Sequence, residues 1–577
     1  MTTRQQLFIR LSSLEEAIEL IYKKIPPKPV GVEEIPLENA LNRVLAEDVY
    51  SPISYPPYPR SIVDGYAVRA DDVVKAWEDH PIKLRVKGEL RIGSSPKGFY
   101  VSGREAIYVD TGSPIPDGAD AVVPIEYTHR INDEVLVYRS VSVGENIAWP
   151  GSDVVKGEII ALKGTRLLAY HIGVLANVGI RKVKVYVKPR VAIISTGDEL
   201  VEPGKELPLG KVYDSNSFLL KALIERDGLV AHRLGIVGDN EKELEELVLK
   251  AVEEYDAVLI SGGTSAGVGD IVYRVLGKVG EVIVHGLKLK PGKPTVIAIV
   301  KNKPVFGLPG NPGSARNVYE VLVKPYLLRL SGEEVREGLE YVEAELALPV
   351  QGARGRRTYI PVILTHNSLK NIISAYPYWY ESYMIKRIID ADGILIVGED
   401  EYAPIQPGIA RKIILLRKPR RNAIVGEESI LLENTASREK LEMIALPSTI
   451  ALKAVERGDA VKGVISSLAI RELPQNIRIL ERTNRKITLL EVNSKNKVPK
   501  VAWYPPGYGI ASIQHRVYEK VSRKYVKVRV RGPLHAKLLL MEGQVDYAIL
   551  PEEYLAEKAN IVEQLGEEEL LLIKLWR

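Results

Sequence analysis

The chain has 577 residues, too many for one hydrophobic core, so several domains are expected. Its hydrophobic content of 46% and charged content of 27% are ordinary for a globular protein, and a net charge of +5 is too small to argue for nucleic acid as a partner. The absence of cysteine excludes disulfides, iron–sulfur clusters, thiolate zinc sites and a cysteine nucleophile. The eight histidines have no paired metal-binding spacing, so any bound metal should be hard and oxygen-ligated.

No apolar run approaches the roughly 18 residues that cross a bilayer. The first residues lead into an amphipathic segment at 14–25 and do not resemble a signal peptide. We therefore expect a cytoplasmic protein with no membrane partner. Few methionines, no cysteine and many Ile, Val, Tyr, Lys, Arg and Glu residues suggest a thermophile.

The N-terminal third mixes short helices, an extended linker and a small β domain. Ser12 and Ser13 are placed to cap an amphipathic helix that begins at Leu14, and residues 38–44 are predicted to form a second short helix. The proline- and tyrosine-rich segment 52–60 is predicted to be extended. Short alternating strands with turns between them indicate the β domain. These strands are expected at 82–87, 106–109, 121–125 and 135–139, followed by a helix at 167–175 and a strand at 182–187.

From Pro189 onward, strands alternate with helices, which predicts a doubly wound parallel sheet covered on both faces. Residues 341–416 are rich in strands again, the basic segment 417–422 is a plausible linker, and a second α/β pattern begins at Ala423. The expected elements of the first α/β region are strands at 190–195, 231–236, 257–261, 295–299 and 304–307, and helices at 216–227, 242–255, 271–276 and 314–330.

Four loops are expected at the carboxyl edge of this first sheet, where the loops of a parallel sheet converge on one crevice. The glycine-rich turn 262–270 joins a buried strand to a helix, an arrangement that exposes backbone N–H groups to phosphate or another anion. Together the four loops predict a phosphorylated or otherwise anionic ligand. The candidate ligand-binding residues on them are Ser195, Thr196, Gly197, Asp214, Asn216, Gly262, Gly263, Thr264, Ser265, Pro309, Gly310, Asn311 and Pro312.

Three lysines, Lys288, Lys290 and Lys293, lie in a stretch whose backbone is fixed by two prolines and a glycine. At least one ammonium is therefore expected to point inward and bind phosphate or an oxyanion, although a solvated strand edge would have the same composition. The stretch matches neither a P-loop nor a dinucleotide-binding fingerprint.

Several carboxylates fall on or near the same loops. Glu199, Asp239 and Asp270 are candidate ligands for Mg²⁺ bridging a pyrophosphate, because Mg²⁺ prefers hard oxygen ligands. The alternatives are a helix cap for Asp239 and plain solvation for one of the pair Asp198 and Glu199. In the β domain, Asp64 and Thr111 lie in tight turn-rich motifs that turn chemistry alone would also explain.

Seven motifs, in this order, resemble the molybdopterin molybdenumtransferase family, the MoeA type related to the E domain of gephyrin. The resemblance covers about residues 1–417. The motifs are VDGYAV (63–68), TGSPIPDGADAVV (111–123), STGDEL (195–200), YDSN (213–216), SGGTSAG (261–267), KPGKP (290–294) and GLPGNP (307–312).

The resemblance implies a multidomain α/β and β fold and an elongated insertase. It also implies that molybdate is inserted into adenylylated molybdopterin while Mg²⁺ assists a hydrolysis that releases AMP. The expected domains are 1–54 with 151–187 (linker and dimerisation), 55–150 (small β), 188–332 (α/β, MogA/MoaB-like, binding molybdopterin) and 333–417 (β-barrel). Residues 423–577 are similar to two-lobed periplasmic-binding-protein-like domains.

The resemblance also assigns roles to residues. It implies a homodimer with a shared active site, in which Asp64 and Thr111 of one subunit act with Glu199 and Asp270 of the other. Positions matching the family's ligand, metal or catalytic residues further include Asp153, Asp239, Lys290, the 309–312 loop and, in a weaker alignment, Ser382.

Three positions depart from the family pattern, because Ala148, Gly286 and Pro361 stand where basic residues are usual. Their loss is compatible with weakened binding, with the use of tungstate, or with compensation by Lys288. The alternative function is thus a catalytically weakened sensor of molybdopterin or oxyanion. In the C-terminal region, the start of a helix at Ser448 and Thr449 has the composition of an oxyanion site and equally of an ordinary cap.

Overall fold

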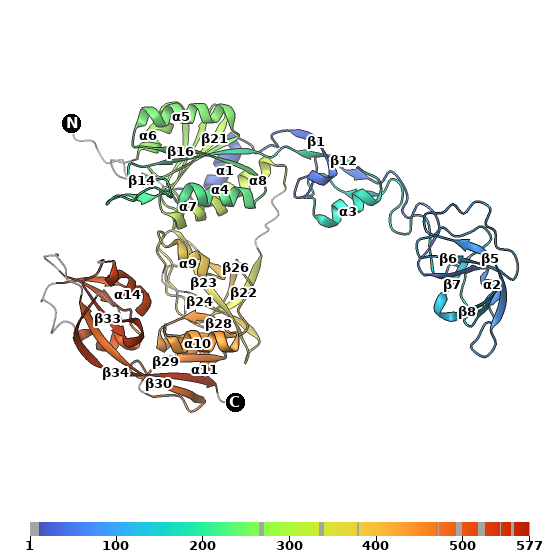
Figure 1. The fold of residues 1–577 in the computed structure, drawn as a ribbon. Coiled ribbons are helices and arrows are strands. Elements are labelled where there is room, and N and C mark those ends of the chain that lie inside the picture. The colour runs from blue at the N-terminus through green and yellow to red at the C-terminus, as the bar shows by residue number, and fades with distance from the viewer. Residues whose placement is uncertain are drawn as a thin grey trace.

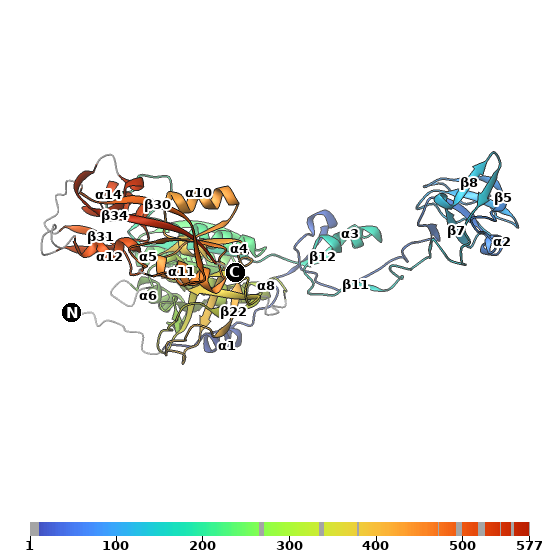
Figure 2. The same ribbon diagram turned by 90° about the horizontal axis from the view of Figure 1, so that it is seen from below.

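The computed structural model describes residues 11–264, 270–333, 340–377, 380–470, 472–491, 499–516, 525–542, 544–555 and 559–575. The molecule is elongated: a small β domain stands at one end, and an α/β domain, a barrel and a C-terminal domain gather at the other (Figure 1). A second view shows the same separation (Figure 2). In the described part of the chain, no helix is both long and apolar enough to cross a membrane.

The first predicted helix is confirmed, and the second prediction is wrong. Helix α1 (Leu14–Lys24) starts with a capping box in which the Ser13 hydroxyl accepts from the Glu16 N–H and the Glu16 carboxylate accepts from the Ser13 N–H. At 38–44 there is only a short 3₁₀ turn, η1 (Leu37–Asn39). Asn42 has a φ of 62°, which ends a right-handed helix, and the next residues bond to the chain around Thr165.

Two extended segments running side by side connect the small β domain to the rest of the molecule. The predicted extended segment 52–60 is one of them, and Tyr55 bridges to Val154 on the other. The supporting elements are β1 (Val32–Pro36) with β12 (Lys182–Tyr186), β2 (Val49–Tyr50) with β11 (Ile159–Ala161), β3 (Arg60–Ser61) with β10 (Ile147–Ala148), and helix α3 (Ala169–Asn177).

The small β domain is one six-stranded sheet with apolar clusters on both faces, as the alternating strands predict. Short helix α2 (Ala70–Val73) covers part of it. The sheet order is β7 (Ala121–Pro124), β4 (Gly65–Val68), β6 (Glu105–Val109), β5 (Ile82–Leu90), β9 (Glu134–Val137) and β8 (Thr128–Ile131).

The α/β domain is doubly wound, as predicted, but one of its strands is reversed. Strand β20 runs against its neighbours because it joins β21 through a two-residue turn, Lys301 and Asn302, both with positive φ. Strand β18 was not predicted. The sheet order is β16 (Val230–Val237), β13 (Arg190–Thr196), β17 (Ala257–Ser261), β21 (Lys303–Leu308), β20 (Val296–Val300) and β18 (Glu281–His285).

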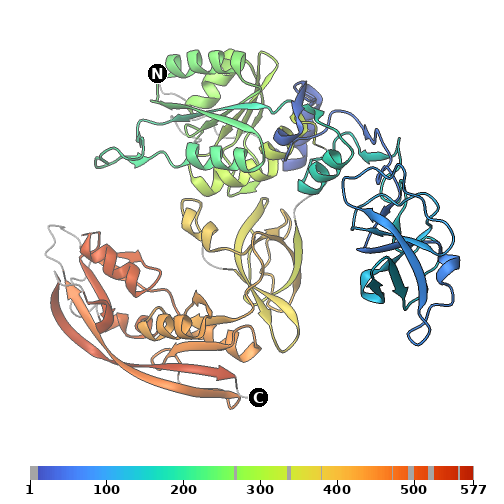
Figure 3. The same ribbon diagram turned by 45° about the vertical axis from the view of Figure 1, so that its right-hand side comes forward.

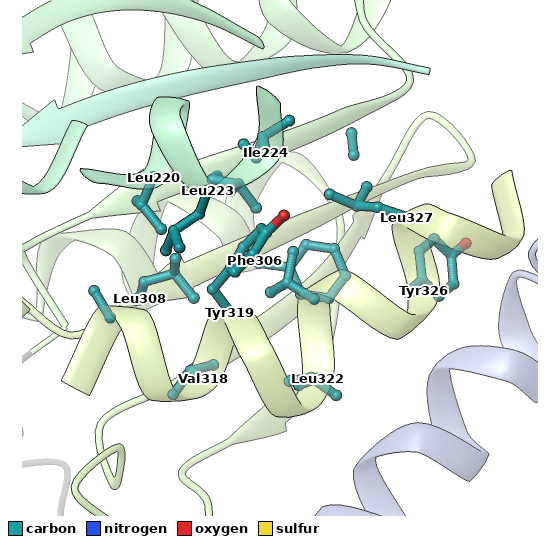
Figure 4. Close-up of a cluster of buried hydrophobic side chains, with 14 of the residues drawn as sticks. Leu220, Leu223, Ile224, Phe306, Leu308, Val318, Tyr319, Leu322, Tyr326 and Leu327 are labelled. Carbon is teal, nitrogen blue, oxygen red and sulfur yellow. The ribbon is translucent and has the colours of Figure 1, made fainter. Parts of the chain in front are cut away.

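Helices fill both faces of this sheet, which fixes the loops at its edge. Helices α5 (Glu241–Glu254) and α6 (Ile271–Val279) cover one face, and α4 (Asn216–Arg226), α1 and the last helices cover the other. Figure 4 shows Leu220 and Leu223 of α4 packed beside Phe306 of β21. The helix predicted at 314–330 is built from α7 (Pro312–Val318), the π-helical turn η3 (Tyr319–Val323) and α8 (Lys324–Leu330).

Five strands after the α/β domain close into a barrel, because β23 pairs with both β24 and β25. A short strand, β19 (Leu289–Lys290), leaves the α/β domain and pairs with β23, aligning Lys290 with Thr358. The barrel therefore holds the lysine-bearing loop in register. Its strands are β22 (Tyr341–Leu346), β23 (Arg357–Asn367), β24 (Ile372–Pro377), β25 (Gly393–Val397) and β26 (Ala410–Leu415), with helix α9 (Ile385–Asp390) between β24 and β25.

The C-terminal domain has two lobes, and two long antiparallel strands, β30 (Ile477–Glu491) and β34 (Asn560–Leu575), run through both (Figure 3). The first lobe docks on the barrel, where buried Asp459 accepts from Ser374 and Tyr376. Its elements are β27 (Ala423–Gly426), α10 (Ile430–Glu439), β28 (Glu442–Ala445), α11 (Ser448–Arg457) and β29 (Lys462–Ser466). The second lobe contains β31 (Lys500–Trp503), α12 (Gly509–Ile513), β32 (Val526–Arg529), α14 (Pro533–Met541) and β33 (Tyr547–Pro551).

Candidate active site

A cavity of about 1040 Å³ lies between the carboxyl edge of the α/β sheet and the barrel. Its size suits a nucleotide-sized ligand. The loops after β13, β17 and β21 form one wall, and the lysine-bearing loop and barrel residues form the other. The predicted site residues that line it are Thr196, Glu199, Asp214, Asn216, Gly262, Gly263, Thr264, Lys290, Lys293, Pro309, Gly310, Asn311, Pro312 and Ser382.

The turn after β17 requires glycine at two successive positions. Gly262 has a φ of 97°, and a Cβ there would lie 2.2 Å from the Thr196 carbonyl oxygen. At Gly263, with a φ of 61°, a Cβ would lie 2.7 Å from a methyl carbon of Ile271. The Gly262 N–H donates to the Leu308 carbonyl and so ties the turn to the next loop. Ser265, also predicted to bind ligand, lies outside the described residues.

Gly262→Ala is expected to lower the free energy of unfolding by about 2 kcal/mol or more. Alanine is strained at this φ, and its methyl group would also collide with the Thr196 carbonyl. Gly277→Ala is the matched control, because Gly277 is helical and has open space beside it, so alanine should leave stability equal or up to about 1 kcal/mol higher. Denaturant unfolding of the two variants measures the difference; equal stabilities would contradict the close approach at Gly262.

Side chains beneath the pocket tie the loops together. The Asn216 amide donates to the Ser261 hydroxyl (2.7 Å) and the Gly310 carbonyl (2.8 Å). Buried Asp214 accepts from the hydroxyls of Ser195 (2.8 Å) and Ser217 (2.6 Å). Asp214 and Ser195 thus bond to protein groups and position the loops. Gly197 is not among the residues that line the cavity; it lies in the turn of the first loop, with a φ of 148°.

The lysine-bearing loop separates its three lysines. Lys290 and Lys293 line the cavity, on either side of a turn. The Asn317 amide holds this turn in place by donating to the Pro291 carbonyl (2.7 Å). Lys288 does not line it, and its ammonium lies 3.8 Å from Glu399. Two of the three predicted lysines therefore lie at the cavity wall.

The barrel completes the pocket. Ser382, from the loop before α9, accepts a hydrogen bond from the Asn311 amide (2.8 Å), and its carbonyl accepts from the Gly313 N–H (2.8 Å). Sequence reasoning missed Arg356, which adds a third cation to the lining, and it missed Tyr359 and Tyr380. Burial raises the pKa of each of these two phenols to about 12, so both stay neutral. The fold alone shows that Arg356 reaches the cavity.

The three predicted metal ligands are not brought together. Glu199 lines the cavity, but Asp239 and Asp270 do not. Asp270 caps helix α6, accepting from the Tyr273 N–H (3.1 Å), and its other oxygen lies 2.9 Å from His285, a partner that the sequence did not reveal. Among the described residues, no cluster of three His, Asp or Glu side chains could hold a metal ion.

The alternative explanation for Asp239, a helix cap, is wrong, because the N-cap of α5 is the next residue, Asn240. The Asn240 side chain accepts from the N–H groups of Lys242 and Glu243, whereas the Asp239 N–H donates to the Asp198 carboxylate. This hydrogen bond between Asp198 and Asp239 connects two loops near the cavity.

Asp64 and Thr111 form a tight pair far from the cavity. The Asp64 carboxylate accepts from the Thr111 N–H (2.6 Å) and hydroxyl (2.9 Å), and these bonds lower the pKa of Asp64. Asp64 directly precedes β4 and Thr111 follows β6, and both strands belong to the small β domain, which stands well away from the α/β domain (Figures 1 and 2). Asp153 lies on one of the connecting segments, where its N–H donates to the Tyr55 carbonyl. Within one chain, these side chains do not reach the cavity.

Comparisons with known proteins agree with this architecture. Three family models match: the MoeA N-terminal region (domains I and II) over 12–179, a probable molybdopterin binding domain over 192–329, and the MoeA C-terminal region (domain IV) over 343–409. A curated molybdopterin molybdenumtransferase of Haemophilus influenzae is 35% identical over 345 residues, covering 60% of this chain and 84% of the relative. The chain belongs to the MoeA family.

Other MoeA relatives give the same result. A putative molybdopterin biosynthesis protein of Methanocaldococcus jannaschii is 35% identical over 336 residues, covering 56% of this chain and 81% of the relative. The crystal structure of a molybdopterin biosynthesis MoeA protein from Pyrococcus horikoshii is 40% identical with a TM-score of 0.60, and covers 71% of this chain and all of that one. The resemblance found in the sequence is confirmed. The predicted enzyme class, a molybdopterin molybdenumtransferase of molybdenum cofactor biosynthesis, is confirmed with it.

The three departures from the MoeA pattern lie in structured positions. Ala148 pairs with Arg60 in the connecting segments, and Gly286 has a φ of 100° and donates its N–H to the Thr295 carbonyl. Pro361 is buried in barrel strand β23 opposite Ile394. Compensation by Lys288 was one of the three alternatives; Lys288 does not line the cavity, whereas Arg356 does.

Proposed function

We propose that the chain inserts molybdenum, supplied as molybdate, into adenylylated molybdopterin held in the 1040 Å³ cavity, with release of AMP. The observation that carries this proposal is the meeting of three cations, Lys290, Lys293 and Arg356, with the glycine turn and the start of α7 in one cavity. The positive charges on this wall can neutralise the negative charges of a phosphoric anhydride and of an oxyanion at the same time. Tungstate has the same shape and charge and is included in the proposal.

Each wall has a separate task in this reaction. The lysines and Arg356 would hold the phosphates and the oxyanion, while the Asn311–Ser382 bond would fix the loop beneath the ligand. Water attacks the phosphoric anhydride and its P–O bond breaks, so that AMP leaves and the pterin keeps its own phosphate. The two dithiolene sulfurs bond to molybdenum, while one oxo group of molybdate takes up the two thiol protons and leaves as water. Asp64 of a second copy, held ionised by hydrogen bonds from Thr111, would join Glu199 at this site.

The described residues do not form a ready metal cage for Mg²⁺. Among the described residues, Glu199 is the one predicted metal ligand on the cavity wall. Any Mg²⁺ in the reaction would therefore have to arrive with the substrate phosphates, which is how this ion usually binds in proteins.

A homodimer is part of the proposal, because Asp64 and Thr111 can act at a cavity only in another copy. An apolar face that the described residues leave exposed supports it: Tyr170 and Val174, one turn apart on α3, are 89% and 37% exposed. Replacing both with lysine should therefore convert the dimer into a monomer, which light scattering after size exclusion measures. Val143→Lys, at an aliphatic residue 69% exposed in the small β domain, should leave the mass unchanged. A double variant that stays dimeric would place the interface elsewhere.

Binding of adenylylated molybdopterin tests the cavity itself. Lys290→Ala and Arg356→Ala should each weaken binding about tenfold or more in calorimetry, because each removes a charge-assisted contact. Lys288→Ala is the matched control, since this ammonium faces Glu399, and it should change the affinity by less than about twofold. Equal losses of affinity in all three variants would indicate that the ligand responds to overall positive charge and does not bind in this cavity.

A further inference from the structure

The two lobes of the C-terminal domain meet on a carboxylate that belongs to the chain itself. Glu427 follows β27 in the first lobe and is fully buried. One of its oxygens accepts from the hydroxyl of Ser448 in the same lobe (2.5 Å) and from the N–H of Gly509 in the other lobe (2.6 Å). A single carboxylate oxygen thus joins the lobes.

The other oxygen of Glu427 faces a buried guanidinium without bonding to it. It lies 3.6 Å from an Arg485 nitrogen and has no hydrogen-bond partner in the described structure. Arg485 is 1% exposed and is bonded to Glu568 (2.7 Å) and Glu553 (2.9 Å). Arg485 sits opposite Glu568 where β30 passes from lobe to lobe, so this charged cluster occupies the hinge.

The cluster holds more negative than positive charge. Glu427, Glu568 and Glu553 share the one guanidinium of Arg485, and burial together with Glu568 raises the pKa of Glu427 to about 7. A buried carboxylate with one unbonded oxygen is costly for a purely structural contact. The donors around it, a hydroxyl, a backbone N–H and a guanidinium, are those that proteins use to bind a carboxylate ligand.

The described residues around Glu427 and Gly509 pack closely in this closed form. A Cβ at Gly509 would lie 1.9 Å from the Ser466 hydroxyl and 2.0 Å from a Glu568 oxygen. The neighbouring Glu428 also lies against the other lobe, because a Cβ at Gly532, just before α14, would lie 2.2 Å from one of its carboxylate oxygens. The chain's own carboxylates therefore stand between the lobes where a ligand would be enclosed.

We propose that the cleft of the C-terminal domain is a carboxylate-binding site that the chain fills with its own Glu427, so that the lobes are closed without a ligand and an external carboxylate enters only in its place. The protein is thus more than an insertase: it carries a second, self-occupied anion site.

The test is chemical rescue in the full-length chain. Glu427→Ala removes the Cγ and carboxyl atoms that acetate would replace, and amide hydrogen exchange reports on the Gly509 N–H that Glu427 holds. The variant should exchange at this amide about tenfold faster or more than wild type, as expected on loss of a hydrogen bond to a charged group. Acetate at about 100 mM should recover most of the protection, whereas chloride should not, and wild type should not respond.

Two controls make the outcome decisive. Glu442→Ala, at an exposed glutamate in the same lobe, should leave the Gly509 amide protected with or without acetate. Glu427→Gln keeps an acceptor for Ser448 and Gly509 and should stay closed and insensitive to acetate. An unchanged Gly509 amide in Glu427→Ala would overturn the bridge between the lobes. If acetate did not restore protection from exchange in Glu427→Ala, whether the loss was confined to the Gly509 amide or spread over residues 423–575, the proposed carboxylate site would be ruled out.

Discussion

Two inactive variants, Asp64→Asn and Lys290→Ala, should regain about half of the wild-type activity when they are combined in one heterodimer. Each homodimer should fall about a hundredfold or more, because each lacks a charged group at the reacting phosphates. In the heterodimer, one of the two sites takes Asp64 from one subunit and Lys290 from the other, both intact. Co-expression with two affinity tags isolates this species for an AMP-release assay.

The matched control pairs two lesions in the same domain. A heterodimer of Asp64→Asn with Thr111→Ala damages the small β domain of both subunits, so neither site is intact and activity should stay low. If Asp64 instead served the cavity of its own chain, the first heterodimer would also stay inactive. The result therefore decides whether the separation of domains seen in Figures 1 and 2 is bridged by a second copy.

Arg485→Met is expected to destabilise the C-terminal domain by about 3–5 kcal/mol. The guanidinium is 1% exposed and is the shared partner of Glu568, Glu553 and Glu427, so its removal leaves buried carboxylates unpaired. Hydrogen exchange of amides in 423–575 measures the loss, and the amides of the α/β domain should keep their protection.

Arg482→Met is the matched control on the same strand. Arg482 pairs with Glu569 (2.6 Å), but its side chain is 57% exposed, so the change should cost less than about 1 kcal/mol. Equal effects of the two substitutions would show that the hinge cluster is not a buried network.

The sequence predicted the α/β core and the edge where the cavity lies. The apolar run 257–261 and the glycine turn after it are local sequence signals. They can therefore be predicted without knowledge of the fold. The helix predicted at 38–44 failed because long-range pairing of residues 42–45 with the chain near Thr165 and Leu167 outweighs local propensity.

The finer assignment of site residues depends on distances that a single sequence does not contain. Asp214 and Ser195 were predicted to bind ligand; Asp214 lines the cavity and accepts a hydrogen bond from Ser195, which does not line it. Arg356 gave no local sign that it lines the cavity, because barrel pairing with the lysine-bearing loop brings it there. The Glu427–Arg485–Glu568 cluster joins three distant segments and is visible only once the two lobes are folded.

AMP release from adenylylated molybdopterin, followed in the presence of molybdate, of tungstate, and of neither, measures the proposed insertion itself. Release should require an oxyanion, with one metal retained on the pterin for each AMP formed. The oxyanion that supports faster release identifies the metal that the enzyme inserts. Tight binding of the pterin nucleotide without AMP release under any of the three conditions would rule out the insertion and favour a sensor that has lost catalysis.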